Sequence, residues 1–167
     1  MTSTLLAIPV MILLYMLQIG IFSHLLLLRG TVDVVLLGLA AWAIHERVNT
    51  AWIWALVAGA IGAFISALPP FVTFVSYLAV VAIARLLMRR VWQIPVLTMF
   101  AVVFLATLFQ HALTILVLQL QGSPIVWAES FSIVTLPSAL LNLLLALPVY
   151  ALLNDLANWV HPVELEV

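Results

Sequence analysis

The sequence contains neither cysteine nor lysine, and only 7% of its 167 residues are charged. Without cysteine the chain can form no disulfide, no thiolate nucleophile and no cysteine-ligated zinc or iron–sulfur site. Five arginines and six acidic residues leave a net charge of -1, so the chain has no basic field for binding nucleic acid. Soluble domains carry about 25% charged residues. So few charges exclude a soluble enzyme.

Apolar residues, in contrast, make up 67% of the chain, against about 45–50% in soluble domains. They fall into six runs, and a bilayer crossing needs about 20 apolar residues. The sequence therefore predicts an all-α, polytopic membrane protein with a six-transmembrane-helix bundle. Residues 1–167 form a single integral-membrane domain, with spans at about 5–28, 31–45, 51–68, 71–87, 94–118 and 133–153.

Arginine placement orients the bundle, because cytoplasmic loops are enriched in basic residues. With six spans, Arg47, Arg85, Arg89 and Arg90 share a side with both termini, and only Arg29 lies on the other. We therefore expect both termini in the cytoplasm. The short second run leaves an alternative, in which this run is re-entrant, the N-terminus is outside and all five arginines are inside.

Residues near the span ends are expected to contact the polar part of the bilayer. Arg89, Arg90 and Trp92 suit anionic lipid headgroups. All six tryptophans lie near predicted span ends, where an amphipathic ring sits at headgroup level. Arg29 and Asp33 face each other across the first outer loop, and we expect them to form an ion pair there.

The third span carries a broad face of small residues at four-residue spacing. In lipid, where no hydrophobic force drives helices together, such faces let backbones approach closely and gain dispersion contacts. The face either packs against neighbouring helices of the bundle or forms a groove for a partner's transmembrane helix. Its members are Ala51, Ala55, Gly59, Ala63 and Ala67, with Ala58, Gly62 and Ser66 beside them.

Polar residues recur on one face of the fifth span, at the helical spacing i, i+3, i+4 and i+7. The sixth span carries two more, Ser138 and Asn142, one turn apart. His111 and Asn142 have similar expected depths, so these faces should meet, joined by Gln18 of the first span. A hydrogen-bonded network that fixes helix register is the expected role. A proton relay would need an acid, and none is expected at that depth. The network comprises Gln18, Thr107, Gln110, His111, Thr114, Ser138 and Asn142.

Pro137 and Pro148 lie on nearly the same face of the sixth span, and Pro148 should kink it by removing a helix hydrogen bond to Leu144. This kinked span and the small-residue face are the two candidate surfaces for a partner helix. The candidate interface residues are Ala55, Gly59, Gly62, Ala63, Ser66, Pro137, Asn142 and Pro148.

No catalytic or metal-binding motif is visible. The sequence has no GxSxG elbow, no HExxH and no glycine-rich phosphate loop. Its four histidines fall in different segments without metal-ligand spacing. We therefore expect no catalytic residue, no metal and no cofactor, which means that the protein is not an enzyme.

Residues 136–150 read LPSALLNLLLALPVY, with a proline, an asparagine within a leucine run, a second proline and an aromatic residue. This pattern resembles the final helix of the rod shape-determining protein MreD family. Four other parts of the sequence agree with this resemblance: Leu17-Gln18, the short second span after Arg29, Arg47-Val48-Asn49 and the stretch 59–66. Val32 and Ala63 depart from it, because the family often has proline and an acidic residue at these places.

The resemblance implies a non-enzymatic scaffold subunit of the bacterial cell-elongation machinery, which controls cell shape through peptidoglycan synthesis. It implies a multi-pass protein of the cytoplasmic (inner) membrane, in contact with membrane lipids. The implied partner is an MreC-like single-span protein, with MreB, RodA and a class B penicillin-binding protein as indirect partners.

An alternative of a different class is a small-solute-binding membrane subunit of an energy-coupling-factor-type transporter. Such subunits are also small six-helix proteins with alanine ladders, so the fold does not discriminate. A solute binder needs polar groups that converge in an outward-facing pocket.

Overall fold

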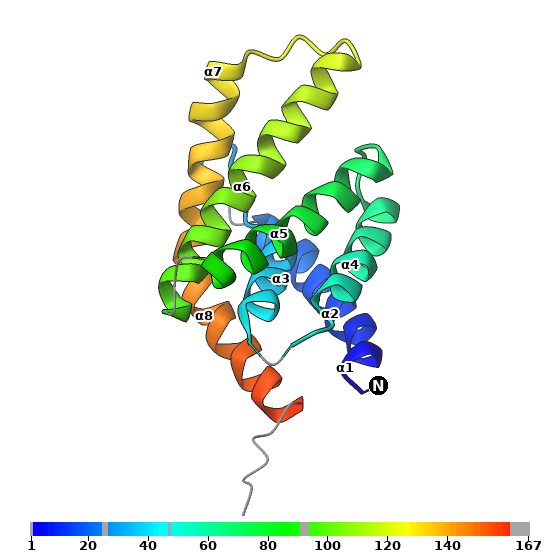
Figure 1. Ribbon diagram of the computed structural model, residues 1–167. Coiled ribbons are helices and arrows are strands. Elements are labelled where there is room, and N and C mark those ends of the chain that lie inside the picture. Colours follow the sequence, from blue (N-terminus) through cyan, green and yellow to red (C-terminus); the bar gives the residue numbers. More distant parts are fainter. Residues whose placement is uncertain (1, 25–26, 47, 91–93, 161–167) are drawn as a thin grey trace, which may run out of the picture.

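The computed structural model describes residues 2–24, 27–46, 48–90 and 94–160, and the side chains of residues 4–24, 27–46, 48–88 and 94–160. Within these ranges every regular element is a helix (Figure 1). The elements are α1 (Thr2–Leu5), α2 (Ala7–Gly20), η1 (Phe22–His24), α3 (Val34–Ile44), α4 (Ala51–Ile65), α5 (Pro70–Arg90), α6 (Pro95–Leu120), α7 (Trp127–Ser130), the π-helical η2 (Phe131–Thr135) and α8 (Leu136–Val160).

Among the described residues, four helical segments are long and apolar enough to cross a bilayer: Ala7–His24, Pro70–Met88, Pro95–Leu120 and Trp127–Val160. The expectation of an all-α fold is confirmed for the described residues, together with that of several helices that could span a membrane by length and composition. Helices α3 and α4 have only 11 and 15 residues. At 1.5 Å per residue they reach about 17 and 22 Å, less than the roughly 30 Å of hydrocarbon in a bilayer.

The helix bounds follow the apolar runs most closely in α6, within two residues at each end. They differ most in the first and the last run. Helix α2 ends at Gly20, and α3 begins only at Val34 after a non-helical segment, residues 27–33. Leu27–Gly30 form a tight turn in it, and residues 31–33 lead from this turn into α3. We call residues 27–33 the extended segment. Helix α4 ends at Ile65, because Pro69 and Pro70 follow closely. The last run is helical well beyond 133–153, from Trp127 to Val160.

The helices form a tall α6–α8 hairpin with the shorter α2, α4 and α5 beside it (Figure 1). The upper part of the hairpin rises beyond the other helices. The start of α1 and the end of α8 lie at the same end of the molecule, at the bottom of the view.

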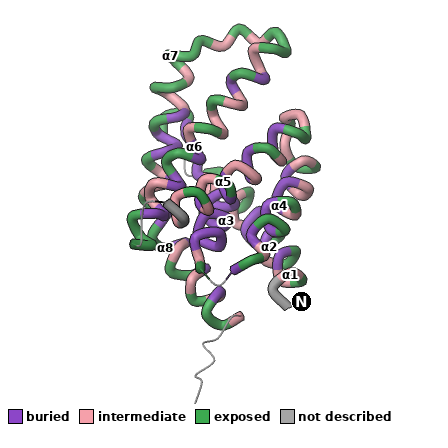
Figure 2. Tube along the Cα trace, in the orientation of Figure 1, coloured by how far each residue is buried: buried purple, intermediate pink, exposed green. Residues whose placement is uncertain are grey.

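Helix α3 is the centre of the core. All eleven of its residues are buried, and it contacts α2, α4, α5, α6 and α8. Figure 2 shows burial concentrated around it, with the upper α6–α8 hairpin mostly exposed. A helix covered on every side needs no amphipathic pattern, which explains the uninterrupted apolar sequence of α3.

Two tryptophans expected at headgroup level lie inside this core instead. Trp42 of α3 and Trp54 of α4 are fully buried and stack with ring centroids 3.9 Å apart and planes 16° apart. For these two residues the headgroup prediction was wrong, since short helices bring their ends into the protein interior. Trp52, Trp127 and Trp159 are exposed.

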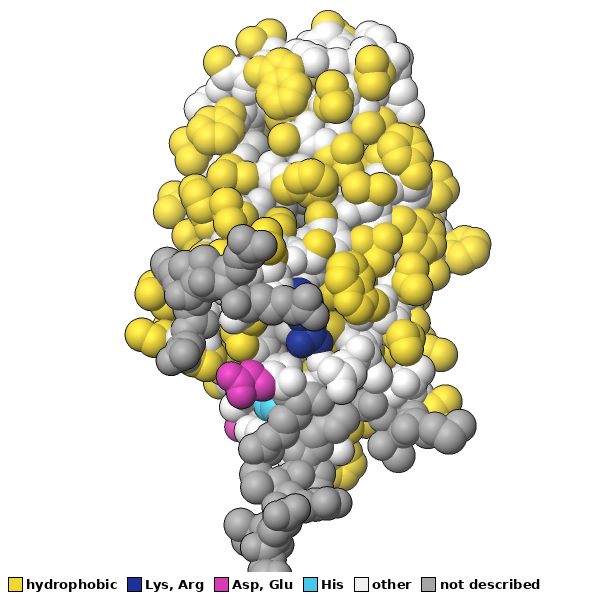
Figure 3. Space-filling view, in the orientation of Figure 1, with side chains coloured by type: hydrophobic (Ala, Val, Ile, Leu, Met, Phe, Trp, Pro, Cys, Tyr) yellow, Lys and Arg dark blue, Asp and Glu magenta, His cyan; other side chains and the backbone are white. Residues whose placement is uncertain are grey.

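Apolar side chains are spread over the whole height of the face seen in Figure 3. The described charged side chains on this face gather toward the end where α1 starts and α8 finishes. A face that is largely apolar and carries its charges toward one end suits a lipid environment.

Candidate functional site

The extended segment 27–33 runs along α8 and is held there through alternate backbone N–H groups. The Arg29 N–H donates to the Ile133 carbonyl at 3.2 Å. The Thr31 N–H donates to Ser138 Oγ at 3.0 Å, and the Asp33 N–H donates to Asn142 Oδ1 at 2.9 Å. Irregular backbone is tolerated at membrane depth only where protein groups satisfy it. Two polar side chains of α8, those of Ser138 and Asn142, therefore satisfy the non-helical backbone of this segment inside the bundle.

Pro137 explains why the Ile133 carbonyl is available. A proline has no N–H, so the carbonyl four residues earlier loses its usual helix partner. The π-helical turn Phe131–Thr135 ends two residues before this proline, and the Arg29 N–H donates to the freed Ile133 carbonyl. The interruption of the last helix is thus the place where the extended segment attaches.

Gly30 makes the closest approach between the two segments. A Cβ atom at Gly30 would lie 2.5 Å from the Ser138 nitrogen and 2.7 Å from Pro137 Cβ. Backbone atoms cannot move aside as a flexible side chain can. The segment can lie against α8 only because residue 30 has no side chain.

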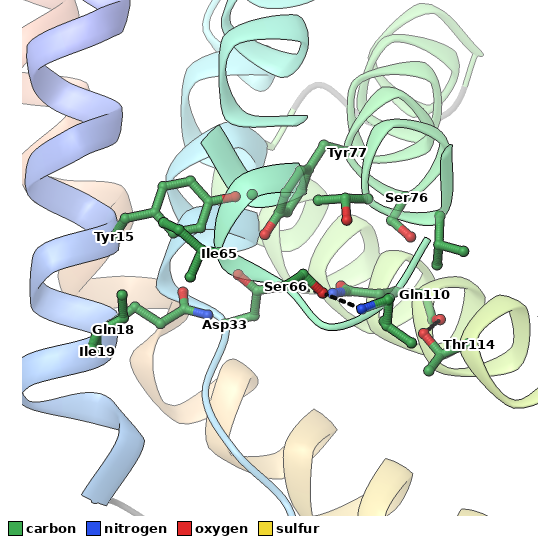
Figure 4. A pocket seen from close by; sticks show the side chains of 14 residues that line it. Tyr15, Gln18, Ile19, Asp33, Ile65, Ser66, Ser76, Tyr77, Gln110 and Thr114 are labelled. Carbon is green, nitrogen blue, oxygen red and sulfur yellow. Dashed lines mark hydrogen bonds between the residues drawn. The ribbon is translucent and has the colours of Figure 1, made fainter. Parts of the chain in front are cut away.

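Asp33 ends the extended segment and begins α3. Its carboxylate accepts the Leu36 N–H at 2.8 Å, as a helix N-cap does, and the Gln110 amide at 2.9 Å (Figure 4). The Tyr77 hydroxyl interacts with the same carboxylate. The expected ion pair with Arg29 is therefore wrong: Asp33 is turned toward α5 and α6, and Arg29 is exposed. An acid does lie beside the polar stripe of α6.

The residues of the expected polar network all form hydrogen bonds within the bundle. Asn142 donates through Nδ2 to Thr107 Oγ1 at 3.0 Å, and His111 Nδ1 lies 3.3 Å from Thr135 Oγ1. The polar faces of α6 and α8 meet, but Asn142 lies opposite Thr107, one turn away from the expected His111. The π-helical turn η2 directly precedes α8 and shifts the register of α8 relative to a continuous regular helix.

Gln18 and Thr114 occupy the ends of this network. Gln18 Oε1 accepts the Val35 N–H at 3.3 Å, which ties α2 to the first turn of α3. The Thr114 hydroxyl donates to the Gln110 carbonyl of its own helix at 2.8 Å. The network therefore joins four helices and the extended segment.

A cavity of about 260 Å³ lies between α2, α4, α5 and α6, next to Asp33 (Figure 4). We call it the Asp33 cavity. None of the described residues that line it is arginine, lysine or histidine. Its principal polar lining residues are Tyr15, Gln18, Asp33, Ser76, Tyr77 and Gln110.

The hydroxyl groups of two tyrosines and one serine in the lining differ in how many hydrogen-bond partners they have. The Tyr15 hydroxyl donates to the Ala58 carbonyl at 2.8 Å, and the Tyr77 hydroxyl interacts with both Tyr15 and Asp33. Ser76 is only 3% exposed, and its hydroxyl oxygen has no hydrogen-bond partner. Buried polar groups are normally hydrogen-bonded, so this hydroxyl has unused capacity beside the cavity.

The small-residue face of α4 is used mostly inside the chain. Ala55, Gly59 and Gly62 are buried, whereas Ala63 and Ser66 are partly buried. A Cβ atom at Gly59 would lie 2.6 Å from the Phe74 ring of α5. At Gly62 it would lie 2.3 Å from the Tyr15 hydroxyl oxygen and 2.6 Å from the methyl group of Thr73. This is the arrangement of packing between neighbouring helices of the bundle.

Helix α8 divides into an inner and an outer face. Pro137 and Asn142 are buried, whereas Pro148 is exposed. The outer face is a stripe of leucines at helical spacing, with Leu140 60%, Leu144 73% and Leu152 69% exposed. No described element of the chain covers this stripe.

The candidate headgroup residues fall mostly outside the described part of the chain. Trp92 and the side chains of Arg89 and Arg90 are not described. The described Arg85 donates from its guanidinium to the Val48 carbonyl.

Sequence reasoning missed Asp33, Tyr15, Tyr77 and Ser76 as lining residues of one cavity. One signal was available for Asp33, because an aspartate directly before an apolar run is a helix N-cap signature. Tyr15 lies in the first apolar run, whereas the adjacent Ser76 and Tyr77 lie in the fourth, so only the tertiary structure brings them together. Within the described ranges, no group of three His, Cys, Asp or Glu residues could hold a metal ion.

No family model, no curated protein and no solved structure matches this chain.

Proposed function

We propose that this protein is a non-enzymatic membrane scaffold that binds the transmembrane helix of a single-span partner on the outer face of α8. The role itself comes from the resemblance of residues 136–150 to the MreD family. It would place the protein in the cell-elongation machinery, with an MreC-like protein as the direct partner. The observation that supports this surface is the open leucine stripe formed by Leu140, Leu144 and Leu152.

The two candidate surfaces differ in what already covers them. On α4, Gly59 and Gly62 pack against α5 and α2, so a partner would first have to displace a helix of the bundle. On α8, the leucine stripe and Pro148 are exposed. Helix association in lipid depends on shape and dispersion contacts, which an uncovered face can supply without rearrangement.

The proposed topology has six crossings with both termini in the cytoplasm. Its support is that the start of α1 and the end of α8 lie at the same end of the molecule (Figure 1). An even number of crossings puts the two termini on the same side of the membrane. The alternative with a re-entrant second run has an odd number of crossings and puts them on opposite sides. Helices α3 and α4 would then complete their crossings with the help of the extended segment and the loops.

Co-purification with an MreC-like single-span protein tests this function. Leu144→Trp on the outer face of α8 should reduce recovery of the partner about tenfold or more, which corresponds to at least about 1.4 kcal/mol. Leu56→Trp is a matched control, because Leu56 of α4 is also exposed, at 48%. Equal recovery with both variants would contradict the assignment of α8.

A second function, small-solute binding in a transporter, is favoured by one specific observation. The Asp33 cavity brings together hydroxyl, amide and carboxylate groups from four elements, as a solute site requires. Such a subunit would co-purify with an energising transporter module, whereas a scaffold would co-purify with a single-span protein. The identity of the partner recovered under the same conditions separates the two functions.

A further inference from the structure

We propose that the Asp33 cavity binds a small primary ammonium group, with the Asp33 carboxylate as its counter-ion and the Ser76 hydroxyl as a further acceptor. This goes beyond the scaffold function and does not depend on it. The cavity has about 260 Å³, slightly below the range of about 300–1,000 Å³ for drug-sized ligands. Its size suits a ligand of a few heavy atoms.

Charge is the first argument. Asp33 is the one acidic residue among the described residues that line the cavity, and no basic residue accompanies it. Its hydrogen bonds to the Leu36 N–H and Gln110 come from neutral donors. The Val35 N–H and the Tyr77 hydroxyl, which also interact with this carboxylate, are neutral as well, so no cation among the described lining residues balances its charge. In a medium of low dielectric constant a cation adds an attraction that neutral donors cannot supply.

The unused hydroxyl of Ser76 is the second argument, and it is independent of charge. Ser76 lies on α5, one residue before Tyr77, and lines the same cavity as Asp33. Its oxygen is buried and has no partner in the protein. An ammonium group has three N–H donors and no acceptor, so it can donate to Asp33 and Ser76 together.

The aromatic lining favours the same ligand class. Tyr15 and Tyr77 both border the cavity, and Figure 4 shows both side chains close to Asp33. A cation near the face of a tyrosine ring is attracted by the ring, and more strongly where the cation is desolvated. An anionic ligand would instead meet the Asp33 carboxylate without any compensating cation in the lining.

The cavity is lined by the last residues of α2 and α4, the α4–α5 connection and the first turns of α5. These lie toward the end of the molecule away from the start of α1. Apolar residues of this rim include Ile19, Ile65 and Leu68. An ammonium group can arrive there on a free amine in water or on the ethanolamine headgroup of a lipid, and both present the same chemistry.

Thermal unfolding of the purified full chain in detergent at pH 7 tests the proposal. Ethanolamine is the probe, and ethylene glycol is its matched neutral control, because a hydroxyl replaces the ammonium group in a molecule of nearly the same shape. At ethanolamine concentrations well above its Kd we expect the Tm to rise by about 3 °C or more. Ethylene glycol should leave the Tm unchanged.

Two variants connect the response to the cavity. Asp33→Asn keeps a residue that caps α3 but removes the charge, and it should weaken ethanolamine binding at least tenfold. Ser76→Ala should weaken it about threefold to tenfold, without loss of folding, since its oxygen has no partner to lose. Both variants are compared by titration calorimetry, which reports binding apart from stability.

Nanodiscs distinguish the two sources of the ligand. If a lipid headgroup supplies the ammonium group, phosphatidylethanolamine discs should stabilise the wild type more than phosphatidylglycerol discs and abolish its response to free ethanolamine. Asp33→Asn should remove this lipid preference. If the ligand is a free amine, ethanolamine should raise the Tm equally in both discs.

The proposal is overturned by any of three results. The first is equal stabilisation of the protein by ethylene glycol and ethanolamine. The second is that Asp33→Asn binds ethanolamine as tightly as the wild type does. The third is that neither free ethanolamine nor phosphatidylethanolamine changes the Tm. The last result would mean that the cavity holds water and Asp33 serves only as a helix cap. Co-purification of the single-span partner reports on the scaffold function separately.

Discussion

At the residue scale, Asn142 shows why one polar side chain is retained within a leucine run. Its Oδ1 accepts the Asp33 N–H, and its Nδ2 donates to Thr107. The side chain is 1% exposed, so no solvent could replace either bond. It joins α8, α6 and the extended segment at one point.

Replacing Asn142 by alanine should lower the free energy of unfolding by about 1–3 kcal/mol, because it leaves the buried Asp33 N–H without a partner. Thermal unfolding in detergent measures this change. Thr107→Val removes only the acceptor for the Asn142 amide and should cost less. A larger effect for Thr107→Val would contradict the assigned role of Asn142 as the support of the extended segment.

Gly30 should be intolerant of any side chain. We expect Gly30→Ala to destabilise the protein by about 1–3 kcal/mol through overpacking, because the added Cβ would meet backbone atoms of α8. Gly20→Ala is the control, since no atom lies within 4 Å of a Cβ built there. If both variants unfolded at the wild-type temperature, the close approach of segment 27–33 to α8 would be wrong.

At the element scale, α4 and α5 pack through glycine on one helix and an aromatic ring on the other. Gly59 of α4 faces the Phe74 ring of α5. Such small-residue contacts replace the hydrophobic force that is absent between helices in lipid. The packing of the short helix α4 against α5 thus depends on the close approach of the two backbones more than on the length of α4.

A larger residue at position 59 should separate these two helices. We expect Gly59→Leu to lower the free energy of unfolding by about 1–3 kcal/mol or more, and Phe74→Leu added to it should restore part of the loss by making room. Thermal unfolding of the two single variants and the double variant measures this. Strictly additive losses would mean that residues 59 and 74 do not touch.

At the scale of the whole molecule, the sequence predicted the long helices well and the interior poorly. Helix α6 was predictable because an uncharged, mainly apolar run of its length has no other stable form in lipid. The polar positions, such as Asn142, were conspicuous for the same reason. Their roles as supports of an extended segment were not predictable, because Thr31 and Ser138 are more than a hundred residues apart in sequence.

The buried position of α3 could not be predicted from the sequence, for a different reason. In lipid the exterior is as apolar as the core, so composition does not tell a covered helix from an exposed one. Trp42 and Trp54 have the composition of interface residues but stack inside the protein. Only the short length of the second apolar run indicated that this segment was unusual.

Single-cysteine labelling of intact cells tests most directly whether the chain crosses a membrane in the proposed sense. The chain has no native cysteine, and both Gln121, after α6, and Asp155, near the end of α8, are exposed. A membrane-impermeant maleimide should label Gln121→Cys from outside and label Asp155→Cys only after permeabilisation. Labelling of both positions from the same side, or protein that stays monodisperse in buffer without detergent, would contradict the six-crossing membrane bundle.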